Sequence, residues 1–280
     1  MSSLELFFLV AAGALYAAAF VLARKGLLRY AFFSIVAALF SHLCSVVIRW
    51  AGVGHPPVYG TYEATLAASW FLVLYVALSF RSVHRHFRLL VLTSVPIALL
   101  LLLYGIVFFN TERIPLTISE QSLWVDFHAL FSWLAFAPFT LAFCLSAFYL
   151  WSTRIGGALA PTAAAPDRSL NIIDELAFRY ISFGFFNHSV MFALGSYYSS
   201  ILFGDWWQWD PVFSISLLAW LLVGLYIHMR IFYNWGGGRA ARLYVGIFAV
   251  IIVSYWGLIY LPAGQTFHVF DLAPGTHVQR

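Results

Sequence analysis

The chain has 280 residues, a formal net charge of +4 at pH 7, and 62% hydrophobic against 9% charged residues. So few charges leave too little polar surface to cover a soluble globule, which indicates an integral membrane protein. Its apolar runs of roughly 20 residues suit helices that cross ~30 Å of hydrocarbon and are too long for the strands of an outer-membrane barrel. The expected fold class is therefore all-α, a polytopic membrane helical bundle.

About eight such runs are predicted to span the membrane. In chain order they cover residues 4–23, 30–48, 64–80, 89–109, 123–151, 176–202, 212–233 and 241–261. A stretch rich in Ala, Pro and Gly after the fifth run predicts a flexible cytoplasmic loop over 152–175. This loop divides a single membrane domain, 1–280, into helices one to five (4–151) and six to eight (176–261), and an outer tail follows over 262–280.

The basic residues predict the orientation of the bundle. Most of them fall in alternate connections, which the positive-inside rule makes cytoplasmic: Arg24, Lys25, Arg29, Arg81, Arg85, Arg88, Arg154, Arg168, Arg230, Arg239 and Arg242. Both termini and the segment 203–211 are then expected on the outer side. The pI of about 9.1 therefore reflects topology in membrane lipid, with no nucleic acid as partner, because the arginines form no basic domain.

The segment 203–211 carries three tryptophans, Trp206, Trp207 and Trp209, between two long apolar runs, and Trp220 follows in the next run. Three tryptophans in four residues exceed what an aromatic belt at a membrane surface requires. An aromatic shelf there suits a large flat ligand. Asp210 stands directly before a proline, and we expect it to cap the next helix, because proline is favoured in the first helical turn.

Histidines are the second class of candidate, because ionisable groups in a bilayer are expensive. His128, just inside the fifth run, and His268, beyond the eighth, are expected near the outer surface, level with the Trp-rich segment. Two imidazoles above an aromatic shelf can supply both axial ligands of a haem iron. Each histidine alone can also be explained as an interfacial anchor.

Three further histidines lie within predicted spans. His228 is nearer the cytoplasmic side, in Tyr226-Ile227-His228-Met229-Arg230, whereas His42 and His188 lie at similar depth, ~18 Å along their helices. The last two either form a bis-histidine haem pair or make hydrogen bonds between helices. If they form a haem pair, an alternative function is that of a haem-b-containing membrane electron-transfer subunit that oxidises quinol.

Four blocks in this order resemble a known family. They are Gly54-His55-Pro56-Pro57 continuing to Tyr62-Glu63, the stretch from Trp124 to His128, the Trp-Trp-x-Trp-Asp-Pro segment continuing through Trp220 to His228 and Arg230, and Trp235-Gly236-Gly237-Gly238-Arg239-Ala240-Ala241 followed by His268. Nearly the whole chain resembles the CcsA/ResC family, the haem-handling membrane proteins of the system II cytochrome c synthase.

The resemblance implies haem handling and delivery in cytochrome c maturation, in the inner membrane of a bacterium. Haem b would be presented at an outer Trp-rich site, the WWD domain, for thioether attachment to the CXXCH segment of apocytochrome c. The implied haem-binding residues are His128 and His268 as outer iron ligands, His228 as an intramembrane iron ligand, and Trp206, Trp207, Trp209, Asp210 and Trp220 as the platform and its surroundings. The expected partners are a CcsB/ResB-like membrane subunit and apocytochrome c.

The sequence departs from the family pattern beside the platform. The family usually has tryptophan where Phe203 stands, and a Lys-Glu pair where Val212 and Phe213 stand. A charged pair next to the expected haem platform has thus become apolar.

Overall fold

The computed structural model describes residues 1–57, 59–82, 84–109, 111–112, 116, 121–159 and 168–257. These residues form helices and no strand, which confirms the all-α fold class. The helices are α1 (Ser3–Arg24), α2 (Leu28–Val53), α3 (Thr61–Ser82), α4 (His84–Phe108), α5 (Leu123–Leu159), α6 (Arg168–Phe203), α7 (Pro211–Phe232) and α8 (Gly237–Ile252), and α8 continues into a π-helical turn, η1 (Val253–Gly257).

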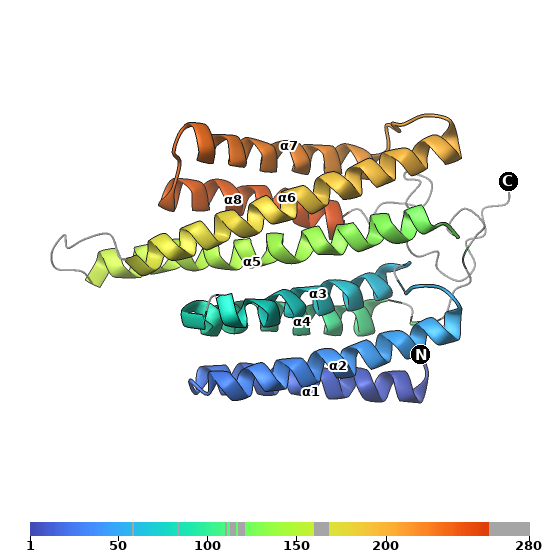
Figure 1. Ribbon diagram of the computed structural model, residues 1–280, viewed down its shortest axis with the longest axis horizontal. Helices are drawn as coiled ribbons and strands as arrows, with labels where there is room; N and C mark the ends of the chain where they lie inside the picture. The colour runs from blue at the N-terminus through green and yellow to red at the C-terminus, as the bar shows by residue number, and fades with distance from the viewer. Residues whose placement is uncertain are drawn as a thin grey trace.

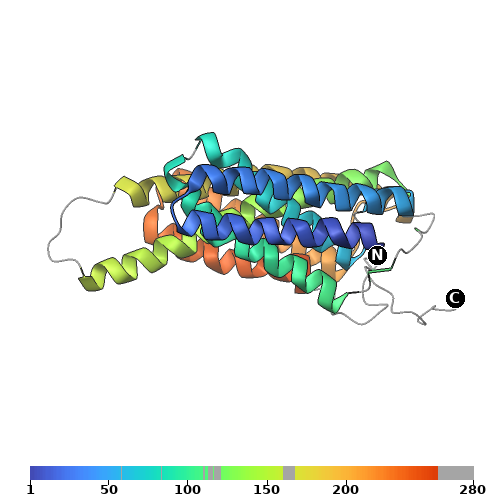
Figure 2. The same cartoon turned by 90° about the horizontal axis from the view of Figure 1, so that it is seen from below.

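The helices lie side by side along the long axis of the molecule, with α1 and α2 at one edge, α3 and α4 next to them, and α5 to α8 beyond (Figure 1). Their directions alternate, so the start of α1, the α2–α3 connection and the segment 203–211 all lie at one end, which we call the Trp end. The α1–α2 and α7–α8 connections lie at the opposite end, where α5 and α6 project beyond the other helices (Figure 2).

Each of the eight predicted spans coincides with one of these helices. Within the part of the chain that the structure describes, seven helices are long and apolar enough to cross a membrane, all except α6. α6 is long but carries polar residues among the apolar ones, including Asp174, Arg179, Asn187 and His188. The chain is a multi-pass membrane protein.

The loop expected over 152–175 differs in the structure, since α5 continues to Leu159 and α6 already begins at Arg168. Beyond the apolar runs, polar side chains accompany the helices. The Thr153 hydroxyl donates to the carbonyl of Tyr149, 3.1 Å away, and Asp174 in α6 pairs with Arg230 of α7. Hydropathy marks where a helix leaves the apolar layer and carries little information about where it ends.

Two large hydrophobic cores, and a smaller one between α3, α5 and η1, fill the described part of the bundle. The first joins α1 to α4 and includes Ile35, Leu72 and Leu90, with contributions from α5 and from the first half of α6. The second lies between α5, α6, α7 and α8 and includes Phe139 and Tyr244. α5 contributes to both cores and makes its most extensive contact with α6. The helix that carries His128 is therefore the central element of the fold.

Candidate functional site

The Trp-rich segment is fixed at both of its ends. The Ser199 hydroxyl in α6 donates to the carbonyl of Asp205 at 2.8 Å, and Gly204 turns the chain with a φ of +79°, a conformation that glycine adopts at low cost. At the other end, the buried Asp210 carboxylate accepts the amide of Val212 at 2.7 Å and caps α7, in which Pro211 is the first residue. The predicted helix cap is confirmed.

Between these anchors the segment presents aromatic rings to the surroundings. Trp206 and Trp209 are 62% and 87% exposed. Trp207 packs edge-on against Trp209 and Phe213, with ring centroids 5.5 and 5.6 Å apart, while its buried indole Nε1 has no hydrogen-bond partner among the described residues. The exposed indoles form a flat apolar surface at the Trp end. Phe213, one of the departures from the family pattern, is part of this cluster.

The aromatic cluster continues onto α6 and α5. Tyr197 of α6 lies 5.9 Å from Trp206 and 4.7 Å from Trp124 of α5, as centroid distances. Next to them an open groove of about 440 Å³ has almost wholly apolar walls, formed by Trp124, Phe186, Ser189, Val190, Ala193, Leu194 and Tyr197. A volume of this order accommodates a ligand rather than a few waters.

His128 lies in α5 at the Trp end and is half-buried. Its Nδ1 is 2.9 Å from the carbonyl oxygen of Met191 in α6. Because a carbonyl can only accept, Nδ1 carries the proton in the neutral ring and the lone pair resides on Nε2. A hydrogen bond of this kind is what orients the histidine ligands of metals in proteins. Gly195 allows the close packing, since a Cβ there would lie 2.8 Å from Nδ1.

The predicted partner of His128, His268, lies outside the described residues, and the bis-histidine arrangement therefore stays a prediction. His228 lies near the end of α7 that is opposite the Trp end. It is exposed, with its ring 4.7 Å from that of Phe232. In the same motif, Arg230 pairs with Asp174 at 2.7 Å and donates to the carbonyl of Trp235 at 3.0 Å.

The structure does not bring His42 and His188 together. His42 is buried in α2, where its Nδ1 is 3.2 Å from the hydroxyl of Tyr16 in α1. His188 is buried in α6 with its ring edge-on to Phe139 of α5. α3, α4 and α5 lie between these two helices (Figure 1). Two residues at equal depth on different helices need not be in contact. The prediction of an intramembrane bis-histidine pair is therefore wrong.

Trp220 also lies away from the Trp-rich segment. It stands ten residues into α7, ~15 Å along the helix from Asp210. Its Nε1 donates to the Ser189 hydroxyl at 2.8 Å and its ring stacks on Phe185. The indole thus joins α7 to α6 within the bundle, and its part in haem binding stays a prediction.

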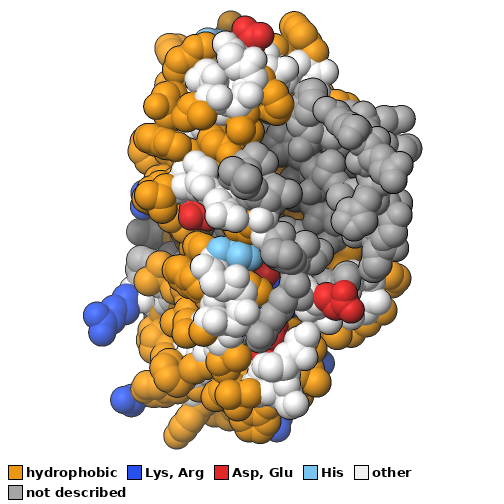
Figure 3. Space-filling model, turned by 90° about the vertical axis from the view of Figure 1, so that its right-hand side faces the viewer, with side chains coloured by type: hydrophobic (Ala, Val, Ile, Leu, Met, Phe, Trp, Pro, Cys, Tyr) orange, Lys and Arg blue, Asp and Glu red, His pale blue; other side chains and the backbone are white. Residues whose placement is uncertain are grey.

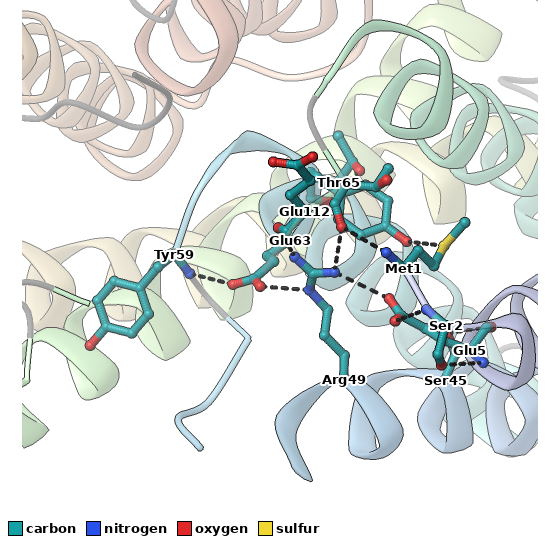
Figure 4. A network of polar contacts seen from close by, with 11 residues as sticks. Met1, Ser2, Glu5, Ser45, Arg49, Tyr59, Glu63, Thr65 and Glu112 are labelled. Carbon is teal, nitrogen blue, oxygen red and sulfur yellow. Dashed lines mark hydrogen bonds and ion pairs between the residues drawn. The ribbon is translucent and has the colours of Figure 1, made fainter. Parts of the chain in front are cut away.

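A buried charge cluster was missed by the sequence reading (Figure 4). Arg49 of α2 pairs with Glu63 of α3 at 2.6 Å and with Glu5 of α1 at 3.3 Å, and none of the three residues is more than 4% exposed. The guanidinium also donates to the carbonyls of Thr111 and Glu112. We call these three side chains the Arg49 hub. One signal was available: all three charges stand at the same end of consecutive apolar runs.

The end of the bundle that carries these residues shows few basic side chains on its described surface (Figure 3). Seen from this end, the described surface shows acidic side chains and a histidine, with lysine and arginine near the margin (Figure 3). Within the described residues no group of three or more His, Cys, Asp or Glu side chains is arranged to hold a metal ion. The geometry favours a flat aromatic ligand with the His128 imidazole at the same end of the bundle.

Comparisons with known proteins agree with this picture. Residues 58–264 match the family model described as cytochrome c assembly protein. The chain is 26% identical over 247 residues to a cytochrome c biogenesis protein CcsA of Prochlorococcus marinus strain MIT 9301, covering 78% of each chain. It is 27% identical to the CcsA proteins of P. marinus strain MIT 9515 (83% of this chain, 81% of the relative) and Synechococcus sp. strain RCC307 (82% and 81%). The chain belongs to the cytochrome c assembly protein family, in its CcsA/ResC group, and has a role in cytochrome c biogenesis.

Proposed function

We propose that this chain binds haem b at the Trp-rich segment and presents it for thioether attachment to the CXXCH segment of apocytochrome c. The observation that carries the proposal is the position of His128, oriented through Nδ1 by the Met191 carbonyl at the end of the bundle that exposes Trp206 and Trp209. These residues fit a haem, because the indoles offer a flat apolar surface and the unpartnered Nε1 of Trp207 offers a donor.

The contribution of the chain is positioning. Trp206, Trp207 and Trp209 would cover the haem and exclude water from it, while His128, through Nε2, and His268 would hold its iron. Bound haem supplies the two vinyl groups, to each of which a substrate thiol adds, forming one carbon–sulfur bond while the thiol proton goes to the neighbouring vinyl carbon. No side chain acts as a nucleophile, since the substrate brings its own thiols.

The placement of charge supports an orientation of the bundle in the membrane. Basic residues gather at the end opposite the Trp end: Arg24, Lys25, Arg29, Arg81, Arg88, Arg154, Arg230, Arg239 and Arg242. We place that end in the cytoplasm, so that the haem site faces the periplasm from the inner membrane of a bacterium. His228, exposed on α7, is then available for a second haem whose other ligand comes from a CcsB/ResB-like subunit, together with which the chain forms a cytochrome c synthase.

The test is the absorption spectrum of the detergent-purified protein, oxidised and reduced. We expect bands of non-covalent b-type haem, a partial loss of them in His128→Ala, and their recovery with millimolar imidazole. His42→Leu serves as the control and keeps the wild-type spectrum. The proposal fails if the wild-type protein holds no haem. If the His42 variant loses the bands and the His128 variant keeps them, the protein is an electron-transfer subunit instead.

A further inference from the structure

The α2–α3 connection at the Trp end is built around a single tyrosine. α2 ends at Gly54, which has a φ of +82°, and α3 begins at Thr61. Between them the backbone amide of Tyr59 donates to Glu63 Oε2 at 3.0 Å, and the ring of Tyr59 meets His55 edge-on at 5.4 Å. The backbone of Tyr59 is thereby fixed to the Arg49 hub.

The hub itself is a rigid anchor. Its guanidinium joins α1, α2, α3 and the chain that follows α4, and it is 2% exposed. Four hydrogen bonds from one planar group leave it little freedom to move, because each is charge-assisted or made to a backbone carbonyl. In Figure 4 the Tyr59 amide faces Glu63 while its phenol ring points away from the hub.

The phenol reaches the central helix. Its hydroxyl donates to Asp126 Oδ1 at 2.8 Å, and Asp126 lies in the first turn of α5, two residues before His128. That turn is partly exposed, since Leu123 is 73% exposed and Phe127 48% exposed, and its other described contact to a neighbouring helix is the packing of Trp124 on Tyr197. A first helical turn with few packed side chains frays readily, so a hydrogen bond to the Asp126 carboxylate adds to the order of the turn.

We infer that Tyr59 is a positioning residue for haem ligation: it transmits the fixed position of the Arg49 hub to the first turn of α5 and thereby sets how His128 meets iron. The segment from His55 to Glu63 would then contribute to haem binding, and the inference rests on the proposed function. Tyr59 itself touches neither haem nor substrate.

The test variant is Tyr59→Phe, which deletes the hydroxyl and keeps the ring that packs on His55. We expect the His128-dependent part of the haem spectrum to fall about 3- to 10-fold, the size expected for losing one ordinary intramolecular hydrogen bond, and to recover with imidazole. Hydrogen exchange of the amides in the first turn of α5 should become faster. The matched control is Tyr30→Phe, which removes an exposed hydroxyl in α2 at the opposite end.

Asp126 provides the second half of the test. Asp126→Asn keeps an acceptor at Oδ1 and should stay close to wild type, whereas Asp126→Leu should reproduce the effect of Tyr59→Phe. Combining Asp126→Leu with Tyr59→Phe should cost no more than either change alone, because both remove the same bond.

The outcomes separate the two claims. If wild-type haem depends on His128 but Tyr59→Phe leaves the spectrum, the imidazole response and the exchange rates unchanged, the inference is wrong and the proposed function stands. If the Tyr59→Phe effect adds fully to that of Asp126→Leu, the contact does not act as the link described and the inference is also overturned. If wild-type protein has no His128-dependent haem, both claims fall together.

Discussion

Gly195 determines how closely α6 approaches His128. A Cβ at this position would lie 2.8 Å from Nδ1 and 2.9 Å from Cε1 of the imidazole. Gly195→Ala should therefore push the ring away from the Met191 carbonyl and weaken iron ligation at the outer site. We expect loss of the His128-dependent haem bands and their recovery with imidazole, measured by absorption spectroscopy.

Gly246→Ala is the matched control, because an added Cβ in α8 meets nothing within 4 Å and alanine favours a helix over glycine. It should keep the wild-type spectrum with equal or higher thermal stability. A wild-type spectrum in Gly195→Ala would show that the position of the imidazole tolerates displacement.

Asp210 offers a test between capping and haem binding. As the cap of α7 it accepts the Val212 amide, so Asp210→Ala should lower the free energy of unfolding by ~0.5–2 kcal/mol, while Asp210→Asn and Asp210→Ser retain most of it. Thermal unfolding and the haem spectrum should be recorded for all three. Should Asp210→Asn lose haem at unchanged stability, the carboxylate acts on the cofactor in addition to the helix.

At the scale of helices, α7 is joined to α6 by the Arg230–Asp174 ion pair, whose side chains are 12% and 15% exposed. A double-mutant cycle with Arg230→Gln and Asp174→Asn should give a coupling free energy of ~1–3 kcal/mol in thermal or denaturant unfolding. The exposed Arg179–Glu175 pair within α6 is the control, and its coupling should stay below ~1 kcal/mol. Equal couplings would mean that partial burial adds nothing to the Arg230 pair.

The sequence was sufficient to predict the helices and insufficient to predict their ends and partners. Apolar runs have the length of a membrane crossing, so each of the eight predicted runs falls on one of the described helices. Hydropathy did not predict that α5 and α6 stay helical beyond their apolar runs. Backbone hydrogen bonds and ion pairs such as Arg230–Asp174 stabilise a helix without apolar side chains, and hydropathy does not detect them. Asp210 was predictable as a helix cap because an aspartate directly before a proline is a local sequence pattern.

At the scale of the whole molecule, contacts between distant residues escaped prediction. Arg49 has no recognisable partner in the sequence, whereas the fold places Glu5 and Glu63 beside it, 44 and 14 residues away in the chain. For His42 and His188 the error was the reverse, a predicted contact that does not exist. Their similar depth suggested a pair, but other helices lie between α2 and α6. Hydropathy predicts the depth of a residue in the membrane. The rotation of its helix and the identity of the neighbouring helices depend on side-chain packing.

The position of His42 in the first half of the bundle gives a further prediction. His42 lies with α1 to α4, and its Nε2 has no hydrogen-bond partner among the described residues. The double variant His42→Leu with Tyr16→Phe removes both members of the buried polar pair and should leave stability equal or higher. Its haem spectrum should be that of wild type, whereas loss of haem would restore a site in the first half of the bundle.

α7 is the least enclosed of the spanning helices, with 17% of its membrane-length window buried against 67% for α5. Arg230 ties one end of α7 to Asp174 of α6, and the Trp220 indole joins its middle to Ser189. Because a helix moves as a rigid rod, a tilt of α7 about Trp220 would displace the Trp-rich segment and His228, ~26 Å apart, in opposite directions. Occupancy of one candidate haem site would then be mechanically coupled to the position of the other.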